Sequence, residues 1–199
     1  MRGAATLLAL LILAVPAGAL VRVPSDLQPI PGNPANRLAD LPIEDFAYDD
    51  ATRCTPKKRR PGVEAFTAWI LRSAQGANWG SYRCETWGRG QASLHAEGRA
   101  LDWHPASARE AKRVILLLLA PDPAGNVQAL ARRMGVQEII WDCGYWRSGM
   151  AEFSEYGPCL GKRGRPRKNV NPTVAHRDHV HFGFTKSGSA RATSFWSGS

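Results

Sequence analysis

The sequence predicts an α+β domain in which helices flank a small antiparallel sheet. Stretches with a helical spacing of apolar residues and recognisable end signals lie at 61–76, 107–119 and 122–135. Short apolar stretches of strand length lie at 136–141 and 180–184. Because these helices and strands do not alternate regularly, the sequence favours an antiparallel sheet over a parallel one.

The first two predicted helices have clear signals at their ends. Pro61 suits the first turn of one helix, and Gly76 is expected to end it. Ser107 and Glu110 form a capping box for the next helix. Its apolar run 114–119 is too short to cross a membrane, so this helix is predicted to be the buried centre of the domain.

The third predicted helix has Asp122 as N-cap, Pro123 in its first turn and Gly135 after its last turn. Residues 77–105 are rich in glycine and tryptophan and lack periodicity, which predicts loops and short strands of the kind that carry functional sites. Most of the tryptophans are expected in the core. Those that could line a cleft are Trp103, Trp141 and Trp146.

The first residues have the pattern of a signal peptide, and the predicted organisation is a signal peptide at 1–19, a loosely packed linker at 20–60 and a domain at 61–199. Arg2 supplies the positive start, 7–15 the apolar core and Ala17-Gly18-Ala19 the cleavage site. A retained membrane anchor is the alternative. Cleavage would lower the net charge from +9 to +8, which favours anionic surroundings such as a cell wall, an acidic polysaccharide or nucleic acid.

An exported chain is expected to pair its cysteines as disulfides. No pair has the C-x-x-C spacing of a zinc knot, and three pairings of the four cysteines are possible. We expect Cys54–Cys84 and Cys143–Cys159, because neighbours in sequence close the smaller loops. Cysteine ligands to a metal are the alternative.

The five histidines fall into two clusters, each of which also contains an aspartate, and this pattern predicts a metal site that closes when distant segments meet. His95, Asp102 and His181 would supply three ligands to Zn²⁺ and leave a fourth position for water. Gly98 allows the turn that brings His95 and Asp102 to the same side.

The second cluster also suggests catalytic residues. His179 and His181 are two residues apart and share one face of a strand. Asp178 is expected in the loop before that strand, where its carboxylate would take a proton from metal-bound water. His179 would stabilise a developing oxyanion as a hydrogen-bond donor.

The pattern S-x-H-x-x-G-x-A-x-D at 93–102 resembles the signature of the D-alanyl-D-alanine carboxypeptidase family of zinc peptidases. That family shares its site architecture with lysostaphin-type peptidases and the hedgehog signalling domain. The resemblance, over roughly residues 63–185, implies that His95, Asp102 and His181 bind zinc and that Asp178 is the catalytic base.

Ser81-Tyr82-Arg83 is similar to the S-G-Y-R segment of that family, which implies that Arg83 contacts the substrate. The glycine is missing here, and Asp-His-Val-His at 178–181 replaces the Glu-x-x-His with tryptophan of better-known members. The sequence therefore resembles a little-characterised secreted branch, and the exact bond cut is not implied.

The segment 161–168 contains R-G-R-P, the core of a DNA-binding AT-hook. An exported, disulfide-bonded protein seldom meets DNA, so no nucleic acid partner is expected, and a solvated loop able to touch anionic wall polymer is the favoured interpretation.

The sequence as a whole predicts a secreted zinc metallopeptidase, a monomer without stable membrane insertion after signal cleavage. It would be a hydrolase of peptide or amide bonds in peptidoglycan peptides, with carboxypeptidase and endopeptidase both open. The alternatives are a non-catalytic zinc-containing domain that binds the cell wall, and a nucleic-acid binder.

Overall fold

The computed structural model describes residues 21, 23–56 and 59–197. Its centre is a six-stranded sheet in which every pair of neighbours is antiparallel. The strands, in spatial order, are β1 (Gly76–Gly80), β4 (Ala100–Pro105), β8 (Val180–Phe184), β5 (Val136–Trp141), β6 (Gly144–Arg147) and β7 (Ser154–Glu155). A separate hairpin is formed by β2 (Thr86–Gly88) and β3 (Gln91–Ala92). The α+β class and the antiparallel sheet are thus confirmed.

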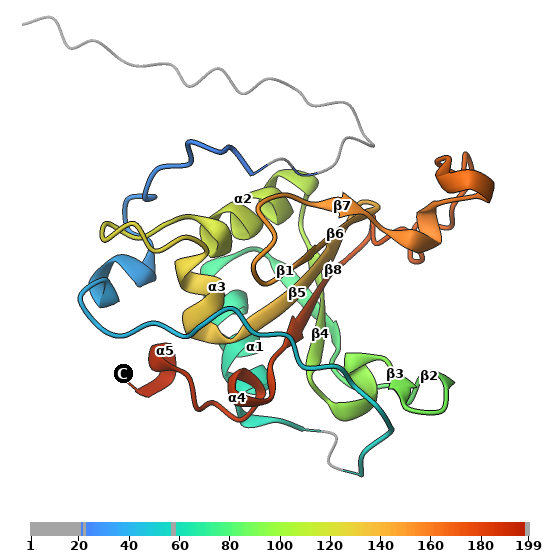
Figure 1. Ribbon diagram of the computed structural model, residues 1–199, viewed down its shortest axis with the longest axis horizontal. Coiled ribbons are helices and arrows are strands. Elements are labelled where there is room, and N and C mark those ends of the chain that lie inside the picture. Colours follow the sequence, from blue (N-terminus) through green and yellow to red (C-terminus); the bar gives the residue numbers. More distant parts are fainter. Residues whose placement is uncertain (1–20, 22, 57–58, 198–199) are drawn as a thin grey trace, which may run out of the picture.

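The helices pack on the sheet through one apolar core. The longer ones are α1 (Pro61–Ser73), α2 (Ala108–Leu119) and α3 (Ala129–Met134), and short ones near the C-terminus are α4 (Lys186–Ser189) and α5 (Ser194–Ser197). Single turns of 3-10 helix are η1 (Pro34–Leu38), η2 (Leu94–Glu97), η3 (Gly157–Cys159) and η4 (Lys162–Gly164). In Figure 1, α2, α3 and α5 lie to the left of the strands, whereas the β2–β3 hairpin and the segment with η3 and η4 project to the right.

The two faces of the sheet are chemically different because side chains alternate along each strand. Leu101 and Trp103 on β4 are fully buried in the core, as is Phe182 on β8. Asp102 therefore points to the opposite face, where it pairs in register with His181. The central strands β4 and β8 thus bury an apolar face under the helices and present on the other face Asp102 and His181, which could bind a metal ion.

Two predicted helix boundaries were wrong. The first helix ends at Ser73, and Gly76 instead opens β1, where a β-carbon would lie 2.3 Å from Nε1 of Trp103. The third helix begins at Ala129 rather than after Asp122. The Asp122 carboxylate accepts hydrogen bonds from the backbone of a tight turn before the helix, at Ala124 and Asn126, so it caps that turn instead. Gly135, with φ +73°, does end α3 as predicted.

Before Cys54, most described residues are exposed or half-buried, but a few specific contacts hold the segment on the domain. The side chain of Asn33 donates to the carbonyl of Leu117 at 2.9 Å, and Ala35 is fully buried. Further along, Ala51 forms a β-bridge with Ala92. The segment is held by individual hydrogen bonds rather than regular structure, so no periodic pattern in the sequence reveals its packing.

Both predicted disulfides, Cys54–Cys84 and Cys143–Cys159, are confirmed. The proposed signal peptide at 1–19 lies outside the described residues. Among the residues that the structure describes, no helix is long and apolar enough to cross a membrane.

The tryptophans expected at a cleft are in the core instead. Trp103 and Trp146 are fully buried, and Trp141 is 4% exposed. Trp79 and Trp87 are the exposed ones, at 51% and 69%. Alternation explains Trp103, because its neighbours Asp102 and His104 occupy the other face of β4.

Candidate metal centre

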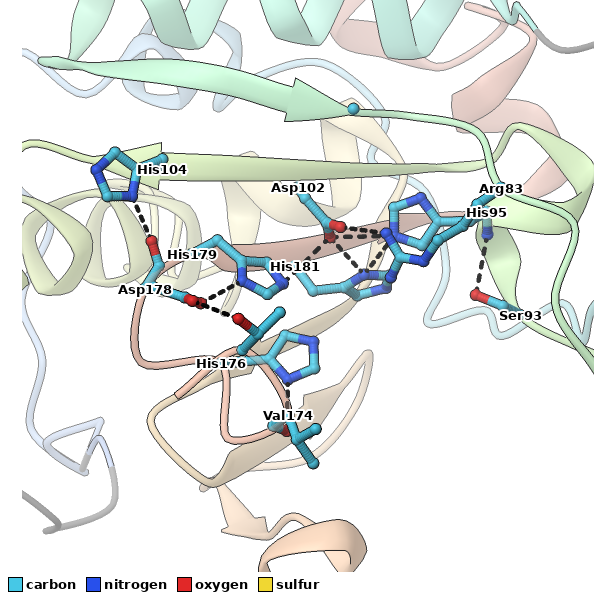
Figure 2. A network of polar contacts seen from close by, with 12 residues as sticks. Arg83, Ser93, His95, Asp102, His104, Val174, His176, Asp178, His179 and His181 are labelled. Atoms are coloured by element: carbon cyan, nitrogen blue, oxygen red, sulfur yellow. Dashed lines mark hydrogen bonds and ion pairs between the residues drawn. The ribbon is translucent and has the colours of Figure 1, made fainter. Parts of the chain in front are cut away.

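The three predicted metal ligands converge. His95 comes from η2, Asp102 from β4 and His181 from β8, and all three are buried. Nε2 of His95 lies 3.0 Å from Oδ1 of Asp102 and 3.0 Å from Nδ1 of His181, and the last two atoms are 3.2 Å apart. Figure 2 shows the three side chains pointing toward one another.

The local sequence explains why His95 faces the sheet. Ser93 caps the single turn η2, since its hydroxyl accepts a hydrogen bond from the backbone N–H of His95 at 3.3 Å. Gly98 ends the turn with φ +67°, a left-handed conformation that glycine adopts readily. The chain then enters β4, so His95 and Asp102 come from two different elements. The alternation of side chains along a single strand therefore does not decide whether they face the same side.

The arrangement fits a tetrahedral metal ion. Ligands about 2.0–2.1 Å from such an ion are separated by about 3.3 Å, close to the spacing of the three atoms here. Three nearly equidistant ligands form one face of a tetrahedron and leave its fourth corner for water or substrate. Two nitrogens and one carboxylate oxygen suit zinc, although the ligands alone do not identify the metal.

Groups behind the ligands fix their orientation. Nε2 of His181 lies 3.1 Å from Oε1 of Glu138, so this nitrogen donates to the carboxylate while Nδ1 faces the other ligands. The hydroxyl of Tyr48 donates to Oε2 of Glu138 at 2.6 Å. A carboxylate behind a ligating histidine is the usual support of a metal site.

Arg83 gives similar support to the aspartate. Its guanidinium donates to Oδ2 of Asp102 at 2.5 Å, which leaves Oδ1 directed at the two histidines. It also forms an ion pair with Glu85 at 2.9 Å, and its side chain is 44% exposed. Arg83 thus faces both a metal ligand and the solvent-accessible side of the site.

When no metal is bound, the pKa values of the three candidate ligands favour one proton, carried by His181. Burial raises the pKa of Asp102, but hydrogen bonds from His181 and His95 outweigh it and hold that pKa well below the usual range. Burial lowers the pKa of His181, but hydrogen bonds to Asp102 and Glu138 outweigh it and raise that pKa to about 9. Burial lowers the pKa of His95. His181 is therefore the ligand that carries a proton at neutral pH.

Asp178 lies in the loop before β8, as predicted, but its carboxylate contacts a histidine rather than the ligand group. Oδ1 is 2.7 Å from Nδ1 of His179, and Oδ2 accepts from the hydroxyl of Thr173 at 2.6 Å. The other ring nitrogen of His179, Nε2, is 3.7 Å from Oδ1 of Asp102. His179 therefore stands between Asp178 and the metal ligands (Figure 2).

His176 adds a further imidazole beside the site. Its ring centroid is 4.6 Å from that of His179 and 5.9 Å from that of His181. Its φ of +51° is rare for a residue other than glycine. Burial, followed by the nearby His181 and His179, lowers its pKa to about 3, so this ring is neutral at physiological pH.

A cavity of about 550 Å³ opens onto the ligand group. Residues just after Tyr48, the β2–β3 hairpin and the side chains of Tyr156 and His176 contribute to its walls. Functional groups in its lining include Tyr48, Arg83, Trp87, Tyr156, His176 and His181. The cavity has the volume of a site for a small molecule or a short peptide segment.

Sequence reasoning missed Glu138 and Tyr48. A charged residue inside the apolar stretch 136–141 was the signal for Glu138, because a buried carboxylate needs a partner. Tyr48 carried no such signal, since it lies in an irregular segment 90 residues away from its partner.

Fold and site together define a protein with a buried group of two histidines and one aspartate that could hold a metal ion. Comparison of the chain with protein-family models, with curated proteins and with solved structures gave no match. The resemblance to zinc peptidases therefore remains a prediction based on the motif at 93–102.

Proposed function

We propose that this protein is a secreted, zinc-dependent hydrolase that cleaves a peptide or amide bond in peptidoglycan peptides. The observation that carries the proposal is the convergence of His95, Asp102 and His181 beside the Asp178–His179 pair. One of these residues, His181, lines the cavity. Zinc in this position would polarise a substrate carbonyl and lower the pKa of a bound water.

The pair of Asp178 and His179 supplies acid–base chemistry. Nδ1 of His179 lies 2.7 Å from Oδ1 of Asp178, and Nε2 of His179 is directed toward the ligand group. In the tautomer that carries its hydrogen on Nδ1, Nε2 has a lone pair available. Nε2 accepts the proton of the attacking water and returns it to the leaving amine. This assignment differs from the expectation that Asp178 itself takes the proton, because His179 lies between the two.

Arg83 is the group best placed to bind the substrate electrostatically. Its guanidinium reaches Asp102 on one side and lines the cavity on the other. A substrate carbonyl or carboxylate in the cavity would receive a charge-assisted hydrogen bond from it. The chemistry is therefore hydrolysis of an amide whose carbonyl lies between Arg83 and His179.

The substrate class follows from the surroundings expected of the chain. Two disulfides fit an extracellular protein, and the predicted signal peptide and the motif at 93–102 both favour a cell-wall substrate. A non-catalytic zinc-containing domain that binds the wall is the competing function. The Asp178–His179 pair favours the enzyme, since a binding domain has no need of a proton acceptor beside the metal.

Metal analysis followed by a turnover assay tests this function. The purified mature protein should contain about one zinc per chain and release products from peptidoglycan fragments. A chelator should abolish release, and added zinc should restore it. His95→Ala should lose both metal and activity. Full zinc without any product would instead support the binding domain, and iron in place of zinc would contradict the proposed chemistry.

A further inference from the structure

Trp79 is an exposed aromatic residue at the edge of the central sheet, and a β-bulge places it there. Asn78 pairs with Trp103 and Gly80 pairs with Asp102, so Trp79 is the extra residue between two consecutive partners on β4. Bulges of this kind re-aim a side chain and recur next to active sites. Trp79 is 51% exposed and lies on an edge strand that is mostly exposed.

The indole is held in a fixed orientation by the site itself. It stacks on the ring of His104 with a centroid distance of 4.4 Å and an interplanar angle of 2°. Nδ1 of His104 is in turn 2.5 Å from the backbone carbonyl of Asp178. The indole centroid is 5.9 Å from the ring of His179. One face of Trp79 is therefore covered by His104, and the side chain still offers a flat apolar surface to solvent.

This surface and the cavity lie at different ends of the site. In Figure 2, His104 is at one end, Arg83 and His95 are at the other, and His179 lies between them. Arg83 lines the cavity, whereas neither Trp79 nor His104 does so. A substrate bound at the metal ligands thus meets the cavity in one direction and the indole in the other.

We propose that Trp79, stacked on His104, is a binding subsite for a sugar ring of the glycan strand; this rests on the proposed function. The apolar C–H face of a pyranose matches a flat aromatic ring in shape and polarity. Peptidoglycan peptides carry no aromatic side chain, so the sugar is the flat apolar group that this substrate offers. The cavity then takes the peptide on the other side of the cleaved bond.

The short distance between Trp79 and His179 also limits which bond is cut. An extended chain advances about 3.3–3.6 Å per residue. The rings of Trp79 and His179 are 5.9 Å apart, and a sugar stacked on the open indole face adds roughly 4 Å, so the cleaved bond would lie within about three residues of the sugar. The substrate class is an amide close to the attachment point of the peptide on the glycan.

Kinetics on two matched substrates test the subsite. Both carry the same peptide, and one also carries the disaccharide. The wild-type protein should have the larger kcat/KM on the disaccharide-bearing fragment. Trp79→Ala should lower this kcat/KM roughly 3- to 10-fold, mainly through KM, and Trp79→Phe should retain most of it. The exposed Leu71 on α1 provides the control, as Leu71→Ala should behave like the wild type. Equal losses on both fragments for Trp79→Ala would overturn the subsite.

A binding measurement separates this proposal from the proposed function. The disaccharide alone, added to zinc-loaded protein with isotope-labelled histidine, should shift the ring signals of His104 in the wild type and leave them unchanged in Trp79→Ala. Such a shift without any hydrolysis would support the subsite and refute the hydrolase. Hydrolysis of both fragments at the same rate, with no shift, would refute the subsite and support the hydrolase.

Discussion

At the scale of single residues, the site consists of charged groups that orient the histidines and the ligating aspartate. Glu138 holds His181, Asp178 holds His179, and Arg83 holds the free oxygen of Asp102. Each contact leaves one particular atom directed at the metal position. The proposed chemistry therefore depends on residues outside the three candidate ligands, and substitutions of those residues should separate metal binding from turnover.

Asp178→Asn tests the pair with His179. Asparagine keeps the shape of the side chain, but its neutral amide is a weaker acceptor for the Nδ1–H group of His179 than the carboxylate is. Hydrolysis should fall by a factor on the order of 10²–10⁴, while zinc stays bound because the three ligands are unchanged. Zinc content and turnover are measured on the same sample.

His179→Ala is the partner variant of this test. It should keep zinc and lose at least as much activity as Asp178→Asn, because Nε2 of His179 is the proposed proton acceptor. If His179→Ala stays active while Asp178→Asn is inactive, Asp178 is itself the base. Full activity in both variants, with full zinc, would remove the catalytic role of the pair.

Metal binding should release a proton. Hydrogen bonds to Asp102 and Glu138 raise the pKa of His181 to about 9 despite its burial, so Nδ1 is protonated at pH 7 without metal. A ligating nitrogen must be free of its proton. Zinc affinity should therefore rise with pH up to about 9 and fall about tenfold per unit below it. Calorimetric titration at pH 7, in two buffers of different ionisation enthalpy, should show one proton released, and none released would contradict this protonation state.

At the scale of elements, the irregular segment before α1 contributes to the metal centre. Tyr48 reaches Glu138, and the backbone carbonyls of Asp49 and Asp50 accept hydrogen bonds from the guanidinium of Arg99. The β-bridge between Ala51 and Ala92 then ties the segment to the hairpin. These contacts make the segment one wall of the site rather than a tether.

Tyr48→Phe measures that contribution. Without its hydroxyl, Glu138 holds His181 less firmly, so zinc affinity should fall, by up to about 10-fold. Glu138→Gln removes the direct partner and should cost more, about 10- to 100-fold. Competition with a chelator gives both values. Tyr82→Phe is a matched control, since the Tyr82 hydroxyl donates to the carbonyl of Thr55 and not to the ligand group. Unchanged affinity in Tyr48→Phe would show that the contact does not support the metal.

The sequence predicted elements whose signals are local. β5 and β8 were identified because each is a short, mostly apolar stretch of strand length. Gly135 was identified as a helix end because glycine readily adopts the left-handed conformation that ends a helix. β1 was not identified because its sequence, Gly-Ala-Asn-Trp-Gly, has no apolar strand pattern, as expected of an exposed edge strand. The packing of the N-terminal segment depends on contacts between residues far apart in sequence, such as Asn33 with Leu117, and no local pattern encodes these.

For the site too, some features could be predicted from the sequence and others could not. The ligands His95, Asp102 and His181 follow from residue type and spacing, and so does the location of Asp178 in a loop. The direction of the Asp178 carboxylate depends on Thr173 and on the ring of His179, and spacing alone does not determine it. The orientation of Trp79 could not be predicted for a similar reason. A bulge in β1 interrupts the regular alternation from which the direction of a side chain on a strand is inferred.

At the scale of the whole molecule, one exposed loop is strongly positive. Residues 161–168 carry five cations and no acid, and they follow Tyr156 at the wall of the cavity. The Cys143–Cys159 disulfide and a β-bridge between Leu160 and Pro166 hold the base of this loop. A protein of net charge +9 with such a loop should bind anionic polymers.

Neutralising two arginines of the loop tests its role. Arg163→Gln together with Arg165→Gln should lower the salt concentration at which the protein leaves an anionic matrix such as isolated cell wall. Arg72→Gln together with Arg109→Gln removes the same charge from exposed helix positions and should have a smaller effect. Equal shifts for the two double variants would mean that total charge, and not the loop, governs the binding.

Because side chains alternate along β4 and β8, the residues that stabilise the core and the residues of the candidate site can change independently. Substitutions of Leu101, Trp103 or Phe182 alter the packing under the helices, and substitutions of Asp102, His104 or His181 alter the opposite face. A lineage could exchange the polar groups on this opposite face for a new substrate without disturbing the apolar packing under the helices. The same separation gives a protein engineer a rigid platform on which the polar face is the variable part.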